Sequence, residues 1–523
     1  MDGRNSLPRP RPATASARRR RRARRTLGTA AALVGVLVVG AVGYAWHLNG
    51  EIRRVQVKDL RAGTAGSENI LLVGSTSRCV LNTPNPAYGL CSQGVTGVNS
   101  DVVMVLHLVS ATHRVTLLSI PRDTFVPNAR AEGANKIDAA LAEGPGQLVD
   151  AVEEDFGIPI QHYVELNFDT FANVVNALGG VRMYFPMPVY DAYSGLHVGS
   201  PGCRYLNGVQ ALQVVRARHL QYQGPGVTSP DPASWPQEAL SDLARIRRDH
   251  EFLRVLAAAV AHEGIGNPIT DAQIASAVAP QLQVDSGLSA SALAHLILTY
   301  HSVNPDAAPQ YTIPIAVTTF GSYHYRGGDY GDVVFPVEPQ DQQVIDSFLG
   351  VTAATDTVSG RPLPRTSTVA VSVLNGTGVA NQASDTAAAL HRLGFRITGM
   401  GDTTSVSSQA AETVVYYASP AQEAAAQAVA RTLTGFVVLA EDASMVGAGA
   451  QATVVTGSDF TVVAPSPAAP TVRPSSPGPL PSATPGTVAP SPPPSGFQAP
   501  SAAVQPLAAW DPRSCTSAGG AGP

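Results

Sequence analysis

The feature that most constrains this chain is an uncharged, mostly apolar stretch from Thr26 to Leu48, which directly follows an arginine-rich run, Arg18 to Arg25. Roughly 20 apolar residues in a helix suffice to cross a bilayer. A cleavable signal peptide is the alternative, but its apolar part is only about 7–15 residues long. Because basic residues stay in the cytoplasm, we predict residues 1–25 inside, a single membrane-spanning helix over 26–48, and the main domains outside the cell membrane.

The rest of the chain is long enough for more than one domain. It has 523 residues, of which 44% are hydrophobic and only 14% are charged, so two or three separate cores are expected. The net charge of -4 gives no basis for nucleic-acid binding. Composition predicts a stalk over 49–66, a large α/β domain over 67–350, a linker over 351–366, a small α/β domain over 367–463, and a disordered Pro-rich tail over 464–523.

Alternating strand and helix patterns predict layered α/β folds for both domains. In the large domain, strands are predicted over Glu68–Gly74, Asp101–Leu108, Val115–Ile120 and Val181–Val189, and helices over Ala139–Phe156, Phe168–Leu178 and Ser241–Ala261. In the small domain, strands are predicted over Val369–Leu374, Phe395–Ile397, Thr413–Tyr417 and Ala452–Val455, and helices over Asn381–Leu393 and Ala421–Thr432.

The four cysteines suit an exported protein, in which disulfides form. Cys79 and Cys91 flank a Pro/Asn/Gly-rich loop, and we expect them to pair and pin it. Cys203 and Cys515 are left unassigned, because four cysteines allow three pairings and Cys515 falls in the predicted tail. Their spacing does not resemble that of a zinc site.

No common catalytic signature occurs, since GxSxG, HExxH, GxxxxGK and GxGxxG after a strand are all missing from the sequence. Charged residues instead stand where strands end. Arg122 and Asp123 follow a buried strand directly, and open α/β sheets bind ligands at the carboxyl ends of their strands. A surface Arg-Asp pair is the alternative. Asp101 begins another strand and offers an oxygen to a divalent cation, or serves as an Asx turn.

Two further groups carry charge toward the interior. Arg216 and Arg218 follow the apolar run Ala211–Val215, and on an extended backbone they point the same way, which suits two phosphates; a plain basic rim is the alternative. On the helix from Ser241, the apolar face also carries charged residues in its first two turns. Because charged groups are rarely buried without a partner, these residues are expected to meet a ligand or to form an ion-pair network. These inward-facing residues are Asp242, Arg245 and Asp249.

In this order the motifs resemble the LytR-CpsA-Psr family of envelope assembly proteins. The resemblance runs from about Asn69 to Leu256 and rests on NILLVGS, NSDVVMVLHL, SIPRDTFV, NKIDAAL, NALGGVRM, LNGVQALQVVRARH and DLARIRRDHEFL. The segment VSVLNGTGVANQAS resembles the C-terminal LytR-type domain often attached to this family. The resemblance implies a three-layer domain with a central mixed sheet and an apolar tunnel for a polyprenyl chain.

It also implies an activity, namely transfer of a polyprenyl-pyrophosphate-linked glycopolymer to a peptidoglycan acceptor at the cytoplasmic membrane. Asp101 would bind Mg²⁺, and Asp123, ahead of Asp242, would accept a proton while Arg122 supports catalysis. The residues that would contact the diphosphate are Arg122, Lys136, Arg216, Arg218, Arg245 and Arg248.

The sequence departs from the family pattern at three positions. Thr76 stands where the family usually has Asp, Asn99 where it has Arg, and Asp249 where it has Gln. Two other functions therefore stay open beside the transferase. One is a catalytically degenerate scaffold that binds the lipid diphosphate without turnover, and the other is an attenuator-like regulator.

Overall fold

A computed structural model describes the chain between residues 50 and 515. Gaps in this description fall at 59, 63–65, 80, 82–89, 132, 240, 263–275, 277–281, 301, 318–321, 404–409 and 464–505. The predicted cytoplasmic segment and membrane helix, 1–48, lie outside the described residues. Among the helices that are described, none combines the length and the apolar character needed to cross a membrane.

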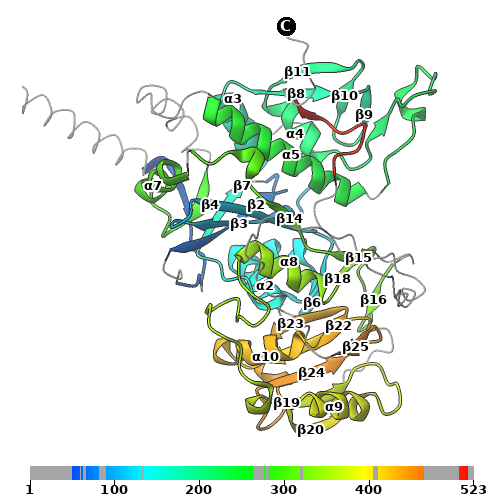
Figure 1. Cartoon of the computed structure of the whole chain (residues 1–523). Coiled ribbons are helices and arrows are strands. Elements are labelled where there is room, and N and C mark those ends of the chain that lie inside the picture. The colour runs from blue at the N-terminus through cyan, green and yellow to red at the C-terminus, as the bar shows by residue number, and fades with distance from the viewer. Residues whose placement is uncertain are drawn as a thin grey trace, which may run out of the picture.

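A mixed seven-stranded sheet forms the centre of the large domain (Figure 1). Its middle strands β2, β3 and β4 are antiparallel, while β7 and β14 run parallel to their neighbours β2 and β4. In spatial order the strands are β1 (Arg53–Val55), β13 (Gln283–Asp285), β7 (His162–Leu166), β2 (Ser67–Ser75), β3 (Ser100–Val109), β4 (Arg114–Ile120) and β14 (Gln310–Thr312). Because β1 pairs with β13, residues 53–55 belong to this domain, and the predicted stalk over 49–66 needs correction there.

One face of the sheet is covered by α2 (Pro145–Phe156) and α8 (Gln340–Leu349) (Figure 1). Leu71 and Val73 point into this core, and Leu72 between them faces the opposite side, as strand geometry requires. The predicted helix over Ala139–Phe156 is divided, because a 3-10 helix, Ile137–Glu143, ends at Gly144, where Pro145 starts α2.

The opposite face is covered by α3 (Phe168–Ala177), α4 (Gly208–Arg216) and α5 (Ser241–His262) (Figure 1). The extended backbone expected for Arg216 to Arg218 begins only at Ala217, because the apolar run Ala211–Val215 and Arg216 are helical. Asn207 and Gln210 form a reciprocal capping box that starts α4, and its apolar residues pack at helical spacing. The short apolar run was ambiguous, and the capping pair resolves it.

Two small sheets lie beyond these helices, with strand orders β10-β9-β12 and β11-β8-β26. Their strands are β8 (Val181–Phe185), β9 (Val189–Asp191), β10 (Leu196–Val198), β11 (Gly202–Leu206), β12 (Gln221–Tyr222) and β26 (Arg513–Ser514). The β26 strand corrects the prediction of a tail without structure, because residues 506–515 fold back onto the large domain. The remainder of the predicted tail lies outside the described residues.

Two disulfides fix this architecture. Cys79–Cys91 confirms the predicted pair, and Cys203–Cys515 joins β11 to the C-terminal segment across 312 residues of sequence. The large domain also contains the shorter elements β5 (Phe125–Arg130), β6 (Gly133–Lys136), α7 (Ala290–Tyr300), β15 (Ile315–Val317), β16 (His324–Tyr325), β17 (Gly328–Asp329) and β18 (Val334–Pro336).

The small domain is a five-stranded sheet with its own core, at the opposite end of the molecule from β26 (Figure 1). Its elements are β19 (Ala370–Asn375), α9 (Gln382–Arg392), β20 (Arg396–Asp402), β21 (Thr413–Tyr417), α10 (Glu423–Ala430), β22 (Leu433–Gly435), β23 (Val437–Glu441), β24 (Ala452–Thr456) and β25 (Phe460–Val462). The predicted strands and helices are found, whereas β22, β23 and β25 were not predicted.

Buried ion pairs hold the small domain against the large one. Arg431 makes a bidentate contact with Asp346 of α8, both bonds being 2.8 Å long. Arg61 bridges Glu153 of α2 and Glu423 of α10 at 3.0 and 2.8 Å. The predicted linker therefore connects two domains that contact each other directly.

Candidate functional site

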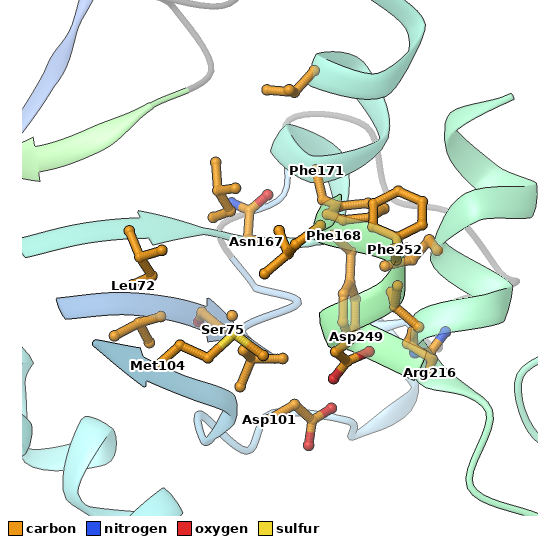
Figure 2. A pocket seen from close by; sticks show the side chains of 18 of the residues that line it. Leu72, Ser75, Asp101, Met104, Asn167, Phe168, Phe171, Arg216, Asp249 and Phe252 are labelled. Carbon is orange, nitrogen blue, oxygen red and sulfur yellow. The ribbon is translucent and has the colours of Figure 1, made fainter. Parts of the chain in front are cut away.

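A largely apolar pocket opens between the central sheet and the helices α3, α4 and α5 (Figure 2). It contains about 990 Å³ of empty space, counting its open mouth. Leu72, Met104 and Val164 come from the sheet, because the alternation that buries Leu71 and Val73 on the other face turns them toward the pocket. The helices contribute Phe168, Phe171, Val174, Val175, Leu212, Val215, Phe252, Leu253 and Leu256.

Charged residues stand at one side of this apolar space. Asp101 at the start of β3, Arg216 at the end of α4, and Arg245 and Asp249 on α5 all line the pocket, and Figure 2 shows Asp101, Asp249 and Arg216 beside its aromatic walls. The inward direction predicted for Arg245 and Asp249 is confirmed. A pocket of this kind suits a ligand with a long apolar part and a polar end.

Asp101 and Asp123 anchor a network of ion pairs at this side. Arg122 contacts Asp101 directly and reaches Asp123 at 3.5 Å from its Nε. Lys136 Nζ donates to Asp123 Oδ1 at 3.0 Å, and Arg218 Nη2 lies 3.8 Å from Asp123 Oδ2. Strand β4 ends immediately before Pro121, so the arrangement at its carboxyl end is the one predicted from the sequence.

Asp242, in the first turn of α5, joins three arginines in the same network. Its Oδ1 lies 3.0 Å from Arg245 Nη2, 3.5 Å from Arg218 Nε and 3.6 Å from Arg122 Nε. Arg245 also reaches Asp101 and Asp249, each at 3.9 Å. Helix α5 thereby brings Asp242 and Arg245, which were expected to face inward, to the carboxyl end of β4.

Two of the predicted diphosphate contacts lie outside this network. Arg216 packs against the Phe168 ring, 4.6 Å from its centroid, and stays in the pocket wall. Arg248 is fully buried on another side of α5, where it contacts Glu238, Asp511 and the carbonyl oxygen of Ala217. It has no direct access to the pocket side that carries Asp101 and Asp249, so any effect on a ligand there is indirect.

Burial and charge set the protonation of the carboxyls. Burial disfavours ionisation of Asp101, but Arg245, Arg122 and Arg218 outweigh it and hold the pKa of Asp101 below its usual value. Burial is likewise outweighed at Asp123, whose pKa Arg122 and Lys136 lower. Burial raises the pKa of Asp249 to about 7 and that of Asp138 to about 6, despite nearby arginines.

Several buried polar atoms in the network lack a hydrogen-bond partner among the described residues. Both carboxylate oxygens of Asp242 and of Asp249 are in this position, as are the Nε atoms of Arg122, Arg218 and Arg245, although ion pairs of 3.0 to 3.9 Å surround them. Buried polar groups are nearly always hydrogen-bonded in folded proteins. The arrangement therefore suits a polar ligand that supplies both donors and acceptors.

The site offers little support for a metal held by protein alone. Within the described ranges, no three His, Cys, Asp or Glu side chains are grouped closely enough to hold an ion. Magnesium, however, commonly takes one or two carboxylates while phosphate oxygens and water complete its shell. The ion pairs of Asp101 with Arg122 and Arg245 both use its Oδ1, so its Oδ2 is the oxygen that would bind such an ion.

Sequence reasoning missed Arg78. Its guanidinium lies 5.3 Å from the centroid of the same Phe168 ring that Arg216 covers. Burial lowers the pKa of Arg78, and the charge of Asp101 opposes that shift. The predicted Cys79–Cys91 disulfide was the signal that could have identified it, because the bridge fixes the loop in which Arg78 stands.

Two of the departures from the family pattern contact each other. Thr76 Oγ1 accepts a hydrogen bond from the Asn99 backbone N–H at 2.9 Å, and the Thr76 N–H donates to the Asn99 carbonyl at 2.9 Å. Arg78 donates to the Thr76 carbonyl at 3.0 Å. Where the family pattern has an acid and an arginine, this protein has a neutral pair with Arg78 beside it.

Curated proteins with similar sequences come from cell-wall assembly. A protein of Corynebacterium glutamicum named "Probable cell wall biosynthesis protein LcpB" is 37% identical over 238 residues, which is 45% of this chain and 52% of that protein. The chain thus spans about half the length of this relative. "Cell wall biosynthesis protein LcpA" of the same organism is 27% identical over 463 residues, 79% of this chain and 83% of that protein.

A third relative, from Bacillus anthracis, is named "Polyisoprenyl-teichoic acid--peptidoglycan teichoic acid transferase TagU" and is 27% identical over 202 residues, 38% of this chain and 65% of that protein. Among solved structures, a LytR-Csp2A-Psr enzyme from Actinomyces oris is 24% identical, with a TM-score of 0.41, over 50% of this chain and 88% of that one. TagV of B. subtilis is 21% identical, with a TM-score of 0.42, over 57% of this chain and 100% of that one.

Family profiles cover both domains. The LytR_cpsA_psr family matches residues 47–333, and the domain described as LytR cell envelope-related transcriptional attenuator matches residues 368–460. The first match alone covers more than half of the chain. The chain belongs to the LytR-CpsA-Psr family and carries the C-terminal LytR domain behind its main domain.

Proposed function

We propose that this protein transfers a polyprenyl-pyrophosphate-linked glycopolymer to peptidoglycan during cell-wall assembly. The observation that carries the proposal is the charged network of Arg122, Arg218 and Arg245 at one side of a pocket whose other walls are apolar. A polyprenyl diphosphate has the same division, with a long hydrocarbon chain ending in a dense anionic group. The name of the relative TagU, a polyisoprenyl-teichoic acid–peptidoglycan transferase, supports this class of substrate, and the names of LcpA and LcpB support a role in cell-wall biosynthesis.

Charge at the site favours an anion of this kind. Six cationic side chains lie in or beside the network, namely Arg78, Arg122, Lys136, Arg216, Arg218 and Arg245. The carboxyls near them include Asp249, whose raised pKa of about 7 reduces its negative charge near neutrality. Guanidinium groups present planar, paired donors that match phosphate oxygens. When the diphosphate enters, its oxygens can therefore take the place of the carboxylates that the arginines now contact.

The reaction that fits is a phosphoryl transfer without a covalent enzyme intermediate. A hydroxyl of the peptidoglycan acceptor attacks the phosphorus next to the sugar, and the bond from that phosphorus to the bridging oxygen breaks. Polyprenyl phosphate leaves, and a phosphodiester joins glycopolymer to peptidoglycan. The arginines neutralise charge at the transferring group, which is the main demand that such chemistry makes on a protein.

The hydroxyl proton needs an acceptor. Asp123 already accepts a hydrogen bond from Lys136 Nζ at 3.0 Å, so it serves better to orient the cations. Asp242 lies among the three arginines and has two carboxylate oxygens without hydrogen-bond partners in the described part of the chain. We therefore assign proton acceptance to Asp242, in reversal of the order expected from the sequence. Asp101 would hold Mg²⁺, which adds charge neutralisation when phosphate oxygens complete its shell.

We propose that this chemistry takes place outside the cell membrane, with the chain anchored by residues 26–48. The two disulfides support an oxidising compartment. The arginine-rich run before the apolar stretch supports a cytoplasmic N-terminus. The partners are then the lipid-linked glycan, the peptidoglycan acceptor and the membrane itself.

The proposal is tested with the full chain in detergent, a polyprenyl-diphosphate glycan, Mg²⁺ and peptidoglycan, by measuring released polyprenyl phosphate and glycan bound to the wall. We expect Arg122→Ala and Arg218→Ala each to slow release by about 100-fold or more, as removal of a charge-stabilising donor does elsewhere. Arg130→Ala is the matched control, because Arg130 pairs only with Glu143 among the ion pairs of the described residues and does so at the surface.

The outcomes separate the two candidate functions. Release by the parent protein, lost in the two site variants and kept in the control, supports the transferase. Tight binding of the lipid diphosphate with no release under any condition would instead support the non-catalytic scaffold, which the Thr76–Asn99 pair favours. Absence of both binding and release refutes the proposal.

A further inference from the structure

A ten-residue segment near the C-terminus is built into the large domain close to the proposed diphosphate site. Its strand β26 pairs with β8, and Cys515 is bonded to Cys203. Trp510 stacks on Tyr222 with the ring centroids 4.0 Å apart and packs against the core beneath α5. Ser514 N–H donates to Glu251 of α5 at 2.7 Å. The segment is thereby held by a covalent bond, a strand pairing and an aromatic contact.

Asp511 is the charged residue at the centre of this contact. It is fully buried, and its carboxylate contacts both Arg247 and Arg248 of α5, at 2.5 and 3.4 Å. Its own backbone helps to hold it in place, since the Ala508 N–H donates to Asp511 Oδ2 at 2.6 Å. A buried carboxylate in such a position stabilises only if its partners are correctly placed, so the geometry of the segment and of α5 depend on each other.

Arg248 connects this carboxylate to the turn at the end of α4 that carries Arg216 and Arg218. The Arg248 guanidinium contacts Glu238 at 2.6 Å and Asp511 at 3.4 Å through Nη1, and it donates through Nη2 to the carbonyl oxygen of Ala217. Ala217 stands between Arg216 and Arg218, where helix α4 ends. A guanidinium held on one side by two carboxylates therefore fixes the carbonyl of the residue between Arg216, which lines the pocket, and Arg218, which belongs to the charged network.

Asp511 supplies one of the buried carboxylates that face the guanidiniums of this cluster. Arg247 and Arg248 both contact it, and Arg248 also pairs with Glu238 and lies close to the charge of Asp249. Without Asp511, Arg247 and Arg248 would each lose a buried partner of opposite charge. The expected response is movement of Arg248 toward solvent or water, and with it loss of the bond to Ala217.

We infer that Asp511 is a positioning residue for diphosphate recognition, which acts through Arg248 on the Arg216–Arg218 turn. The C-terminal segment is then a working part of the site, although some 300 residues of sequence separate it from that turn. This inference rests on the proposed function, because it assigns the turn a role in holding the diphosphate. It predicts an effect on the polar end of the ligand and none on the apolar chain.

The test compares two ligands that differ only at the polar end, geranylgeranyl diphosphate and geranylgeraniol, bound to the full chain in detergent. In the parent protein the diphosphate should bind more tightly than the alcohol. We expect Asp511→Asn to weaken diphosphate binding about tenfold or more while alcohol binding changes less than about twofold, since loss of a buried charge partner shifts the groups that it held. Asp511→Glu should recover part of the preference.

Asp306→Asn is the matched control. Asp306 also pairs with an arginine of α5, Arg254, but at the surface and on a residue that does not contact Ala217 in any described bond. Its ligand preference should equal that of the parent protein. Equal weakening of both ligands by Asp511→Asn, or an unchanged preference, would overturn the inference. If the parent protein shows no preference for the diphosphate, the proposed function fails instead.

A second design avoids variants that fail to fold. A protease site is inserted between residues 464 and 505, the full chain is folded and oxidised, and the site is then cut, which leaves residues 506–523 attached through Cys203–Cys515. Reductant should release the segment and lower the diphosphate preference by the same factor. Uncut protein treated with reductant controls for loss of Cys79–Cys91. An undiminished preference after release of the segment would also overturn the inference.

Discussion

The clearest physical consequence of the site is a pH-dependent cost of burying Asp249. We consider Asp249→Asn, which keeps the shape of the side chain and removes its charge. Burial raises the pKa of Asp249 to about 7 from an ordinary 3.8, against the opposing charges of Arg245 and Arg248. The side chain is almost fully buried, so solvent screening reduces this effect little. The folded protein therefore holds the Asp249 proton more tightly than the unfolded chain does.

The sign follows from that difference. The contribution of Asp249 to the free energy of unfolding is fully present below pH 4 and is lost as the pH rises through 7. Between these values the unfolded chain has released the Asp249 proton while the folded protein still holds it, so a rising pH favours unfolding. At about 1.4 kcal/mol for each pH unit, the loss is somewhat below 2 kcal/mol at pH 5 and about 4 kcal/mol at pH 8. Asparagine does not titrate. The stability of Asp249→Asn relative to the parent protein should therefore increase by about 2–3 kcal/mol between pH 5 and pH 8.

Urea unfolding followed by tryptophan fluorescence measures this change, because Trp235 and Trp510 both lie in the large domain. Comparing the variant with the parent protein at each pH cancels every group that titrates in both. Any constant cost of the amide also cancels between the two pH values. A difference that stays flat, or that decreases with pH, would refute the claim that burial dominates the electrostatics of this pocket.

Three other substitutions test separate parts of the structure. Val174→Trp fills the apolar pocket, and we expect it to weaken geranylgeraniol binding at least tenfold in a direct binding assay, while inorganic pyrophosphate binds as before. Arg431→Met removes the bidentate partner of Asp346 between the domains; at about 3–5 kcal/mol for a broken buried pair, residues 351–366 should become much more sensitive to protease. Asn207→Ala removes the capping box of α4 and should lower the free energy of unfolding by about 1 kcal/mol in urea titrations; no change would contradict its assignment as a cap.

Much of the fold could be predicted because the central strands and the amphipathic helices carry strong periodic patterns. The strands β2, β3 and β4 agree with the predicted ones to within about one residue at each end, and α5 begins at the predicted residue. The extended backbone expected for Arg216 to Arg218 failed for a local reason. The short, mostly apolar run before them fits a strand or a buried helix equally well, and the preceding Asn and Gln were not considered as a cap.

The site was predictable from residues that break the apolar patterns. A charged residue at the end of an apolar element is costly unless it binds a ligand or an ion-pair partner. Arg122, Asp123, Asp242 and Arg245 were found in this way, and the structure brings them together. Arg248 was expected only from the family resemblance, and it serves a different purpose, since its partner Asp511 lies more than 260 residues away. Composition marked that partner's region as an unfolded tail, and no local pattern reveals a ten-residue segment that is stabilised by a distant surface.

The position of β1 limits how far the large domain can be from the bilayer. On the proposed topology, four residues separate Leu48 at the end of the membrane span from Arg53 at the start of β1, and the five Cα–Cα steps between them reach at most about 18 Å when fully extended. So short a connection would keep the large domain close to the bilayer surface. On that topology, a lipid-linked substrate would reach the domain by lateral diffusion within the leaflet.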